Sequence, residues 1–243
     1  IDNSAGVDCS DHEVNIKILL NDVIADGGLS VKARNKLLSQ MDDEVAQLVL
    51  RNNYLQNQTI SFASHFRKLN MPTFIGYIAS LTASGDLDPK IEYLPSAKEL
   101  QARKDAGKYL TRPELSVLLA YSKIVLANAL MSYDFNTERP LIDFVKLAFP
   151  ETLRKTYSSY IENHRMKKQI IVTQLSHYLV SDMGITFAYQ MQSELGVSPL
   201  DVVKAYVAAL EIFDVRALKK AVETLDGEIP SADQHNIGAE VFR

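Results

Sequence analysis

The sequence predicts an all-α protein, a multi-helix bundle of about ten helices. Three observations support this fold class. Glycine and proline are absent from residues 29–71, 114–139 and 151–183, apolar residues recur there at helical spacing, and helix-capping residues occur at intervals along the chain. Strands require turn residues more often, so these uninterrupted stretches favour helices.

Apolar residues share one face in each predicted core helix. Within 114–139 this face consists of Leu115, Leu118, Leu119, Val125, Leu126 and Ala129. Within 151–183 it consists of Ile171, Leu175, Tyr178 and Leu179. Toward the end of the chain it consists of Leu200, Val203, Val207 and Leu210, followed by Leu218, Ala221, Val222 and Leu225. These spacings place each set on one side of a helix, which we expect to be buried.

Helix ends are predicted by capping residues. Three pairs have capping-box spacing, in which two side chains satisfy backbone donors reciprocally: Ser10 with Glu13, Ser96 with Glu99, and Thr111 with Glu114. Proline is expected in a first helical turn at Pro113 and Pro199, and left-handed helix ends at Gly27, Gly184 and Gly196. The only strand-like stretch, Lys90 to Leu94, is too short and isolated to build a sheet. Residues 231–243 resemble the first turns of another helix, and both ends of the chain look truncated.

Composition and charge exclude several classes of protein. The 243 residues are 47% hydrophobic and 23% charged, an ordinary globular mixture, and the net charge of −4 does not favour nucleic acid. The most basic run, His164 to Lys168, is expected on the solvated face of a helix. No targeting segment or membrane-crossing apolar run is visible. A single cysteine, Cys9, permits no intrachain disulfide, and we expect a cytoplasmic protein.

A catalytic apparatus is not visible in the residues alone. The five histidines are scattered without metal-ligand spacing, so no metal site is predicted. Phosphate-binding glycine loops and a nucleophile elbow are missing. Cys9 has His12 nearby, but the acidic residues around it disfavour a thiolate, so an inert cysteine is the better interpretation.

The opening of the chain carries a family resemblance. The pattern N-x-x-G-V-x-x-S-x-x-E, filled by Asn3, Gly6, Val7, Ser10 and Glu13, resembles a segment near the end of the NAD-binding domain of glutamate dehydrogenases. Further phrases are similar to the large NAD-specific enzymes of bacteria: LVLRNNYLQNQ (48–58), LTRPELSVLLAYSKI (110–124) and MGITF (183–187). The resemblance spans nearly the whole chain.

The resemblance implies roles for four residues. Asn3 would contact the NAD cofactor and the bound amino acid, while Gly6, Val7 and Ser10 would belong to the pocket for the substrate's side-chain carboxylate. At a helix N-terminus, the Ser10 hydroxyl would both cap the helix and donate its proton to that carboxylate. Acidic residues at Asp8 and Asp11 depart from the pattern of shorter family members, and their charge opposes carboxylate binding unless they point away.

The resemblance also implies a domain organisation. Residues 1–27 would be the terminal turn and helix of the NAD-binding catalytic domain, and residues 28–243 a C-terminal helical domain. The parent enzyme would oxidise L-glutamate to 2-oxoglutarate and ammonia with NAD. The chain alone would be inactive and would contact the preceding regions of the same polypeptide, in a homo-oligomer. The alternative is a free-standing helical interaction or oligomerisation module without catalysis.

Overall fold

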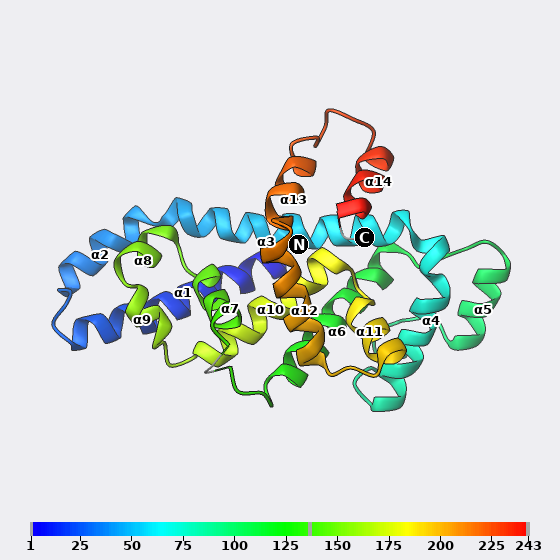
Figure 1. Cartoon of the computed structure of the whole chain (residues 1–243), viewed down its shortest axis with the longest axis horizontal. Coiled ribbons are helices and arrows are strands. Elements are labelled where there is room, and N and C mark those ends of the chain that lie inside the picture. Colours follow the sequence, from blue (N-terminus) through cyan, green and yellow to red (C-terminus); the bar gives the residue numbers. More distant parts are fainter. Residues whose placement is uncertain (1, 136–137, 242–243) are drawn as a thin grey trace. The chain divides into compact units, whose positions relative to one another are not determined.

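The computed structural model describes residues 2–135 and 138–241, and this part of the chain contains fourteen α-helices, one 3-10 helix and no strand (Figure 1). The all-α prediction is therefore confirmed. The helices outnumber the expected ten because two uninterrupted stretches divide at residues other than glycine or proline. The first stretch is broken at Met41 and Phe66, and the second at Tyr157 and at residues 163–166. Met41 and His164 are buried at these breaks.

The chain forms two compact units, each built from two separate segments. Unit 1 comprises residues 1–56 and 133–175, and unit 2 comprises residues 57–132 and 176–243. The division falls within α3 (Asp42–His65) and α10 (Lys167–Met183), so each of these helices contributes residues to both units. The predicted domain boundary after residue 27 stays a prediction.

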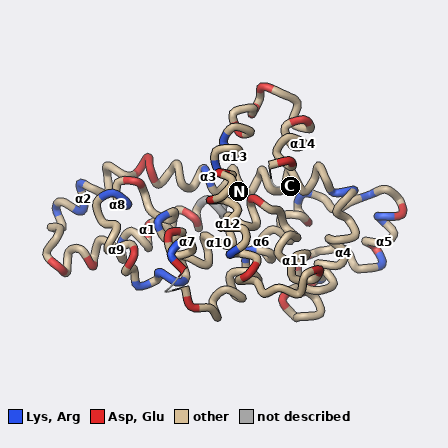
Figure 2. Tube along the Cα trace, viewed as in Figure 1, with Lys and Arg blue, Asp and Glu red and all other residues tan. Residues whose placement is uncertain are grey.

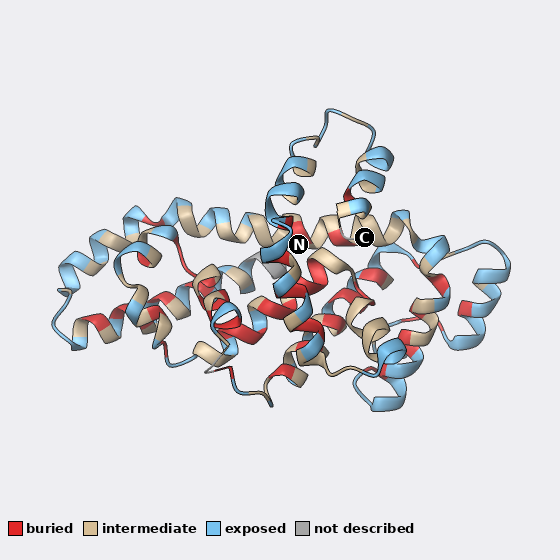
Figure 3. Ribbon diagram, in the orientation of Figure 1, coloured by how far each residue is buried: buried red, intermediate tan, exposed pale blue. Residues whose placement is uncertain are grey.

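Unit 1 surrounds an apolar core to which α1 (Asp2–Ala25) contributes a regular stripe. Its buried residues Ile16, Leu19, Leu20 and Val23 recur at intervals of three and four. The other elements of unit 1 are α2 (Val31–Gln40), α7 (Arg139–Ile142), the 3-10 helix η1 (Asp143–Ala148), α8 (Glu151–Thr156) and α9 (Ser158–Glu162), with the adjoining parts of α3 and α10. Helix α9 packs against both α1 and η1, so the core unites the two segments of the unit (Figure 3).

Unit 2 packs its long helices α6 (Arg112–Leu130) and α12 (Pro199–Ile212) against each other. Its remaining helices are α4 (Arg67–Ser84), α5 (Ala97–Asp105), α11 (Phe187–Leu195), α13 (Val215–Glu223) and α14 (Ser231–Val241). Helices α13 and α14 form a hairpin, drawn in orange and red in Figure 1. The predicted apolar face of α12 is buried at Val203, Val207 and Leu210, whereas Leu218 of α13 is 50% exposed.

Most predicted helix ends are confirmed. Ser96 and Thr111 form capping boxes with Glu99 and Glu114, and Ser198 forms a further one with Asp201. Pro113 and Pro199 lie in first turns, and Gly27, Gly184 and Gly196 have the positive φ that ends a helix in the left-handed conformation. Residues 90–93, the core of the strand-like stretch, form turns.

Charged residues are interspersed along the helices (Figure 2). By length and composition alone, α6 is the one described helix apolar enough to cross a membrane. Its Leu115, Leu118 and Leu119 are buried within unit 2, as expected for the core helix of a folded domain.

An ion-pair cluster joins three short elements of unit 1. The Glu162 carboxylate of α9 accepts hydrogen bonds from Arg139 of α7 at 3.0 and 3.2 Å, and its Oε1 lies 3.0 Å from Lys146 Nζ of η1. The hydrogen bonds from Arg139, and next those from Lys146, lower the pKa of Glu162 to about 2. The deprotonated carboxylate is therefore favoured in the folded protein.

Replacing Glu162 by Gln is expected to reduce stability at neutral pH but not in acid. A lowered folded pKa contributes stability above the ordinary value of 4.5, and this contribution is lost as the pH falls toward 2. Urea unfolding at several pH values should show a loss of about 1 kcal/mol at pH 7 that disappears in acid. Glu13→Gln, which removes an exposed ion pair with Lys17, is the control and should cost less. A loss that is the same at every pH would contradict this account.

Candidate functional site

The opening motif lies inside a helix. Helix α1 begins at Asp2 and continues without interruption to Ala25, so Ser10 is an interior residue. The predictions of a terminal turn before this helix and of a Ser10–Glu13 capping box are therefore wrong. Gly6 is the only glycine or proline between these ends, and a single glycine costs a helix only about 1 kcal/mol, which the rest of a long helix offsets. Since Ser10 is not at the helix N-terminus, the helix dipole gives it no anion site.

The helix nevertheless brings the predicted residues together. Asn3 lies three and four residues before Gly6 and Val7, and Ser10 lies four and three residues after them, which places the four residues along one face of α1. Gly6 and Ser10 are exposed, and Val7 is 57% exposed. For Asn3 only the backbone is described, and it is helical.

Asp8 and His12 lie on another side of α1, directed into unit 1. The Asp8 carboxylate accepts two hydrogen bonds from the Asn52 amide of α3, at 2.8 and 3.0 Å. The His12 ring is buried and its Nδ1 lies 2.8 Å from the carbonyl oxygen of Ala148. A carbonyl only accepts, so Nδ1 carries the proton. The buried Nε2 has no hydrogen-bond partner, its nearest charged neighbour being Asp8 Oδ1 at 3.7 Å.

These contacts concern two expectations from the sequence, the direction of the Asp8 and Asp11 side chains and the inert character of Cys9. Asp8 is engaged with Asn52 rather than directed at the motif face, whereas Asp11 is exposed. Cys9 is also exposed, and the contacts of the His12 ring are with Ala148 and Asp8. No spacing or motif in the sequence assigns a role to Asn52, although this residue belongs to one of the family-like phrases, residues 48–58.

The second half of α1 is held by the segment before α10. His164 is buried; its Nε2 donates to the Asn15 carbonyl at 3.1 Å, and its Nδ1 accepts from the backbone N–H of Met166 at 3.0 Å. Burial lowers the pKa of His164, so the ring is neutral. Arg165 pairs with Asp22 at 2.7 Å. The prediction that residues 164–168 lie on a solvated helix face is thus wrong for His164, which anchors α1.

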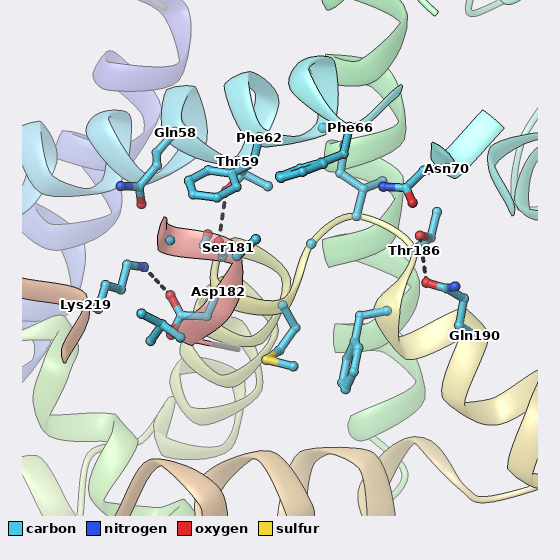
Figure 4. Close-up of a pocket in the computed structure, with 18 of the residues that line it drawn as sticks. Gln58, Thr59, Phe62, Phe66, Asn70, Ser181, Asp182, Thr186, Gln190 and Lys219 are labelled. Carbon is cyan, nitrogen blue, oxygen red and sulfur yellow. Dashed lines mark hydrogen bonds and ion pairs between the residues drawn. The ribbon is translucent and has the colours of Figure 1, made fainter. Parts of the chain in front are cut away.

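Unit 2 contains a cavity of about 280 Å³ (Figure 4). Its walls come from the end of α3, the start of α4, the α10–α11 connection, α13 and α14. The apolar lining includes Phe62, Phe66, Phe74, Met183, Ile185, Phe187 and Val222. The polar lining includes Gln58, Thr59, Asn70, Ser181, Asp182, Thr186, Gln190 and Lys219.

The charged residues in the cavity wall are already paired. Lys219 of α13 forms a close ion pair with Asp182 of α10, and both side chains are largely buried. The second oxygen of the Asp182 carboxylate accepts a hydrogen bond from the Tyr206 hydroxyl at 2.6 Å. Burial first, and then the Asp182 charge, raise the pKa of Tyr206 well above its usual value, so the phenol stays protonated and donates.

Two threonines also form hydrogen bonds at this wall, but one serine hydroxyl does not. Thr59 donates to the Ser181 carbonyl oxygen at 3.2 Å, and Thr186 donates to the Gln190 side-chain oxygen at 3.1 Å. The Ser181 side-chain oxygen is buried without a hydrogen-bond partner. In the described ranges, no three histidine, cysteine or acidic side chains are grouped so as to hold a metal ion.

Family comparisons identify the class of protein. Residues 107–243 match the family model of the glutamate dehydrogenase C-terminal region, and residues 1–63 match that of the bacterial NAD-glutamate dehydrogenase catalytic domain. The first match covers more than half of the chain. The chain therefore belongs to the glutamate dehydrogenase C-terminal family.

Individual relatives agree with this membership. The chain is 41% identical over 243 residues to the NAD-specific glutamate dehydrogenase of Pseudomonas aeruginosa and 38% identical over 243 residues to that of Halomonas elongata. Each alignment covers 100% of this chain and 15% of the relative. The Mycobacterium tuberculosis protein of the same name is 36% identical over 234 residues, which is 96% of this chain and 14% of that protein. The chain thus spans about 15% of the length of the curated relatives it matches.

Replacing Lys219 by Met is expected to destabilise unit 2 strongly. The Asp182 side chain is only 8% exposed. It would keep the hydrogen bond from the Tyr206 hydroxyl but lose its countercharge, which should lower the free energy of unfolding by about 3 kcal/mol. Chemical unfolding measures this loss, and Lys220→Met, which alters the exposed neighbouring lysine, is the matched control. The double variant Lys219→Met/Asp182→Leu should recover much of the stability. Equal effects of the two lysine substitutions would contradict the importance of the pair.

Proposed function

We propose that this chain is a C-terminal portion of an NAD-dependent glutamate dehydrogenase. The reaction converts L-glutamate, NAD and water to 2-oxoglutarate, ammonia and NADH. The observation that carries the proposal is similarity over all 243 residues of this chain, at 38% and 41% identity, to two proteins named NAD-specific glutamate dehydrogenase. A free-standing interaction module has no reason to match both a catalytic-domain model at its start and a C-terminal model at its end.

Within that enzyme, the exposed motif face of α1 is the part we assign to the active site. Asn3 contacts NAD and substrate, and Gly6, Val7 and Ser10 line the pocket for the substrate's side-chain carboxylate. Support comes from exposure: Val7 and Ser10 are not used in the packing of unit 1. The Asn52 hydrogen bonds hold the Asp8 carboxylate, which reduces its repulsion of a bound carboxylate. A hydroxyl within a helix retains a donor for such a ligand.

The described residues do not build a dinucleotide site by themselves. NAD-binding domains of the doubly wound type place the pyrophosphate at the carboxyl ends of parallel strands, and no strand occurs in residues 2–135 or 138–241. The preceding regions of the same polypeptide would have to supply that sheet. We therefore assign residues 1–27 to the edge of the catalytic domain and residues 28–243 to a helical domain that supports it. A cytoplasmic homo-oligomer is the expected assembly.

Substitution of Ser10 by Ala in the full-length enzyme is expected to raise the KM for glutamate. Loss of a hydrogen bond to a charged carboxylate costs about 1.5–3 kcal/mol, which corresponds to a rise of roughly 10- to 150-fold. Steady-state kinetics at saturating NAD measures KM, and circular dichroism checks folding. Ser39→Ala changes another exposed serine of unit 1 and should leave KM unchanged. An unaltered KM in the Ser10 variant would remove Ser10 from the site.

The 243-residue chain alone is expected to be inactive. Without the sheet that binds and orients the nicotinamide, the chain has no means of directing hydride transfer. The measurement is the absorbance of NADH formed from glutamate and NAD by the purified chain, with the full-length enzyme as the positive control. Turnover that increases in proportion to the concentration of the chain would overturn this prediction.

A further inference from the structure

The cavity of unit 2 has the size of a small-ligand site. An engineered protein cavity of about 150 Å³ lined by apolar side chains binds benzene. A cavity of about 280 Å³ therefore has room for a molecule of one or two rings. Its wall carries four phenylalanines and eight polar side chains, and small-molecule pockets combine aromatic surface with polar groups that fix the orientation of the ligand. Flat aromatic faces favour a planar ligand, because rings stack or meet edge to face.

The charge balance of the wall selects an uncharged ligand. Lys219 and Asp182 neutralise each other, and Asp182 also accepts from Tyr206. A charged ligand would have to compete with this arrangement or lie buried without a countercharge, and both are unfavourable. The remaining polar groups in the wall are hydroxyls and amides, which bind neutral donors and acceptors.

Ser181 provides a specific point of attachment. The residue is 7% exposed, lines the cavity and has a side-chain oxygen without a hydrogen-bond partner. Its backbone carbonyl is held by Thr59 at 3.2 Å, which fixes the end of α10 against α3. Buried polar groups in native proteins normally have partners. A ligand N–H or O–H within reach would supply the missing one.

We propose that this cavity is a binding site for an uncharged, planar aromatic molecule of one or two rings with a single N–H or O–H group. The ring lies among Phe62, Phe66 and Phe187, and its polar group bonds to Ser181. The family-like phrase MGITF, residues 183–187, forms one wall, although the proposed dehydrogenase site makes no use of it. The proposal is independent of the dehydrogenase assignment, because every lining residue belongs to unit 2 and the α1 motif to unit 1.

Indole and its isostere indene are the probes. They have the same two-ring shape, but only indole has an N–H group. The chain contains no tryptophan, so indole fluorescence can be followed without a background from that residue. Both probes are expected to bind and to raise the thermal unfolding temperature as their concentration increases, with indole the tighter.

Variants identify the site. Ser181→Ala should weaken indole binding about fivefold, the effect of one lost hydrogen bond, and leave indene binding unchanged. Because the Ser181 hydroxyl has no partner in the protein, this variant should be as stable as the parent chain when no ligand is present. Ser176→Ala, a buried serine of the same helix outside the cavity lining, is the matched control. Ala63→Phe places a ring in the cavity and should abolish binding of both probes, whereas Ala120→Phe on the exposed side of α6 should not.

Three results would overturn the proposal. The first is absence of indole binding to the folded chain. The second is equal weakening of indole and indene by Ser181→Ala, because the hydroxyl would then act only through packing. The third is binding to the 243-residue chain but not to the full-length enzyme, because another segment of the polypeptide would then occupy the cavity. The comparison of indole with indene in Ser181→Ala decides the question even if Ala63→Phe does not fold.

Discussion

The apolar stripe of α1 determines which side of this helix faces outward. Burial of Ile16, Leu19, Leu20 and Val23 fixes the rotation of the helix about its axis. At 100° per residue, the centre of the face that carries Asn3, Gly6, Val7 and Ser10 lies about 140° from the centre of this stripe. The exposure of Gly6, Val7 and Ser10 therefore follows from the packing of residues that begin more than one helical turn further along α1. His12 is on the same side as the stripe and is buried with it.

Local signals in the sequence were sufficient for the fold class and for many helix ends. The capping boxes at Ser96 and Thr111 involve residues three positions apart, so their geometry requires no tertiary information. The start of α1 was mispredicted for the converse reason. Ser10 and Glu13 have the spacing of a capping box, but no proline between Asp2 and Ser10 prevents the helix from starting earlier. A helix that starts at Asp2 forms more backbone hydrogen bonds than one that starts at Ser10.

Long-range features could not be predicted in this way. His164 looked like part of a solvated basic run, yet its ring bonds to a carbonyl 149 residues earlier in the chain. The cavity is lined by residues from Gln58 to Val241, and no spacing in the sequence indicates that they meet. The motif on α1 was assigned through family resemblance, and only the structure showed that Asn52 holds the Asp8 carboxylate beside it.

The interleaved segments of the two units have a consequence for folding. Unit 1 needs residues 133–175 to close a core begun by residues 1–56, and unit 2 needs residues 176–243 to complete one begun by residues 57–132. Neither core can form from one continuous stretch, so each must close a loop of many residues at an entropic cost. During synthesis on the ribosome, unit 1 cannot complete its core until residues 133–175 have been made, which is after more than half of these 243 residues. Until then the apolar stripe of α1 is exposed, and during this interval the polypeptide is most prone to aggregate.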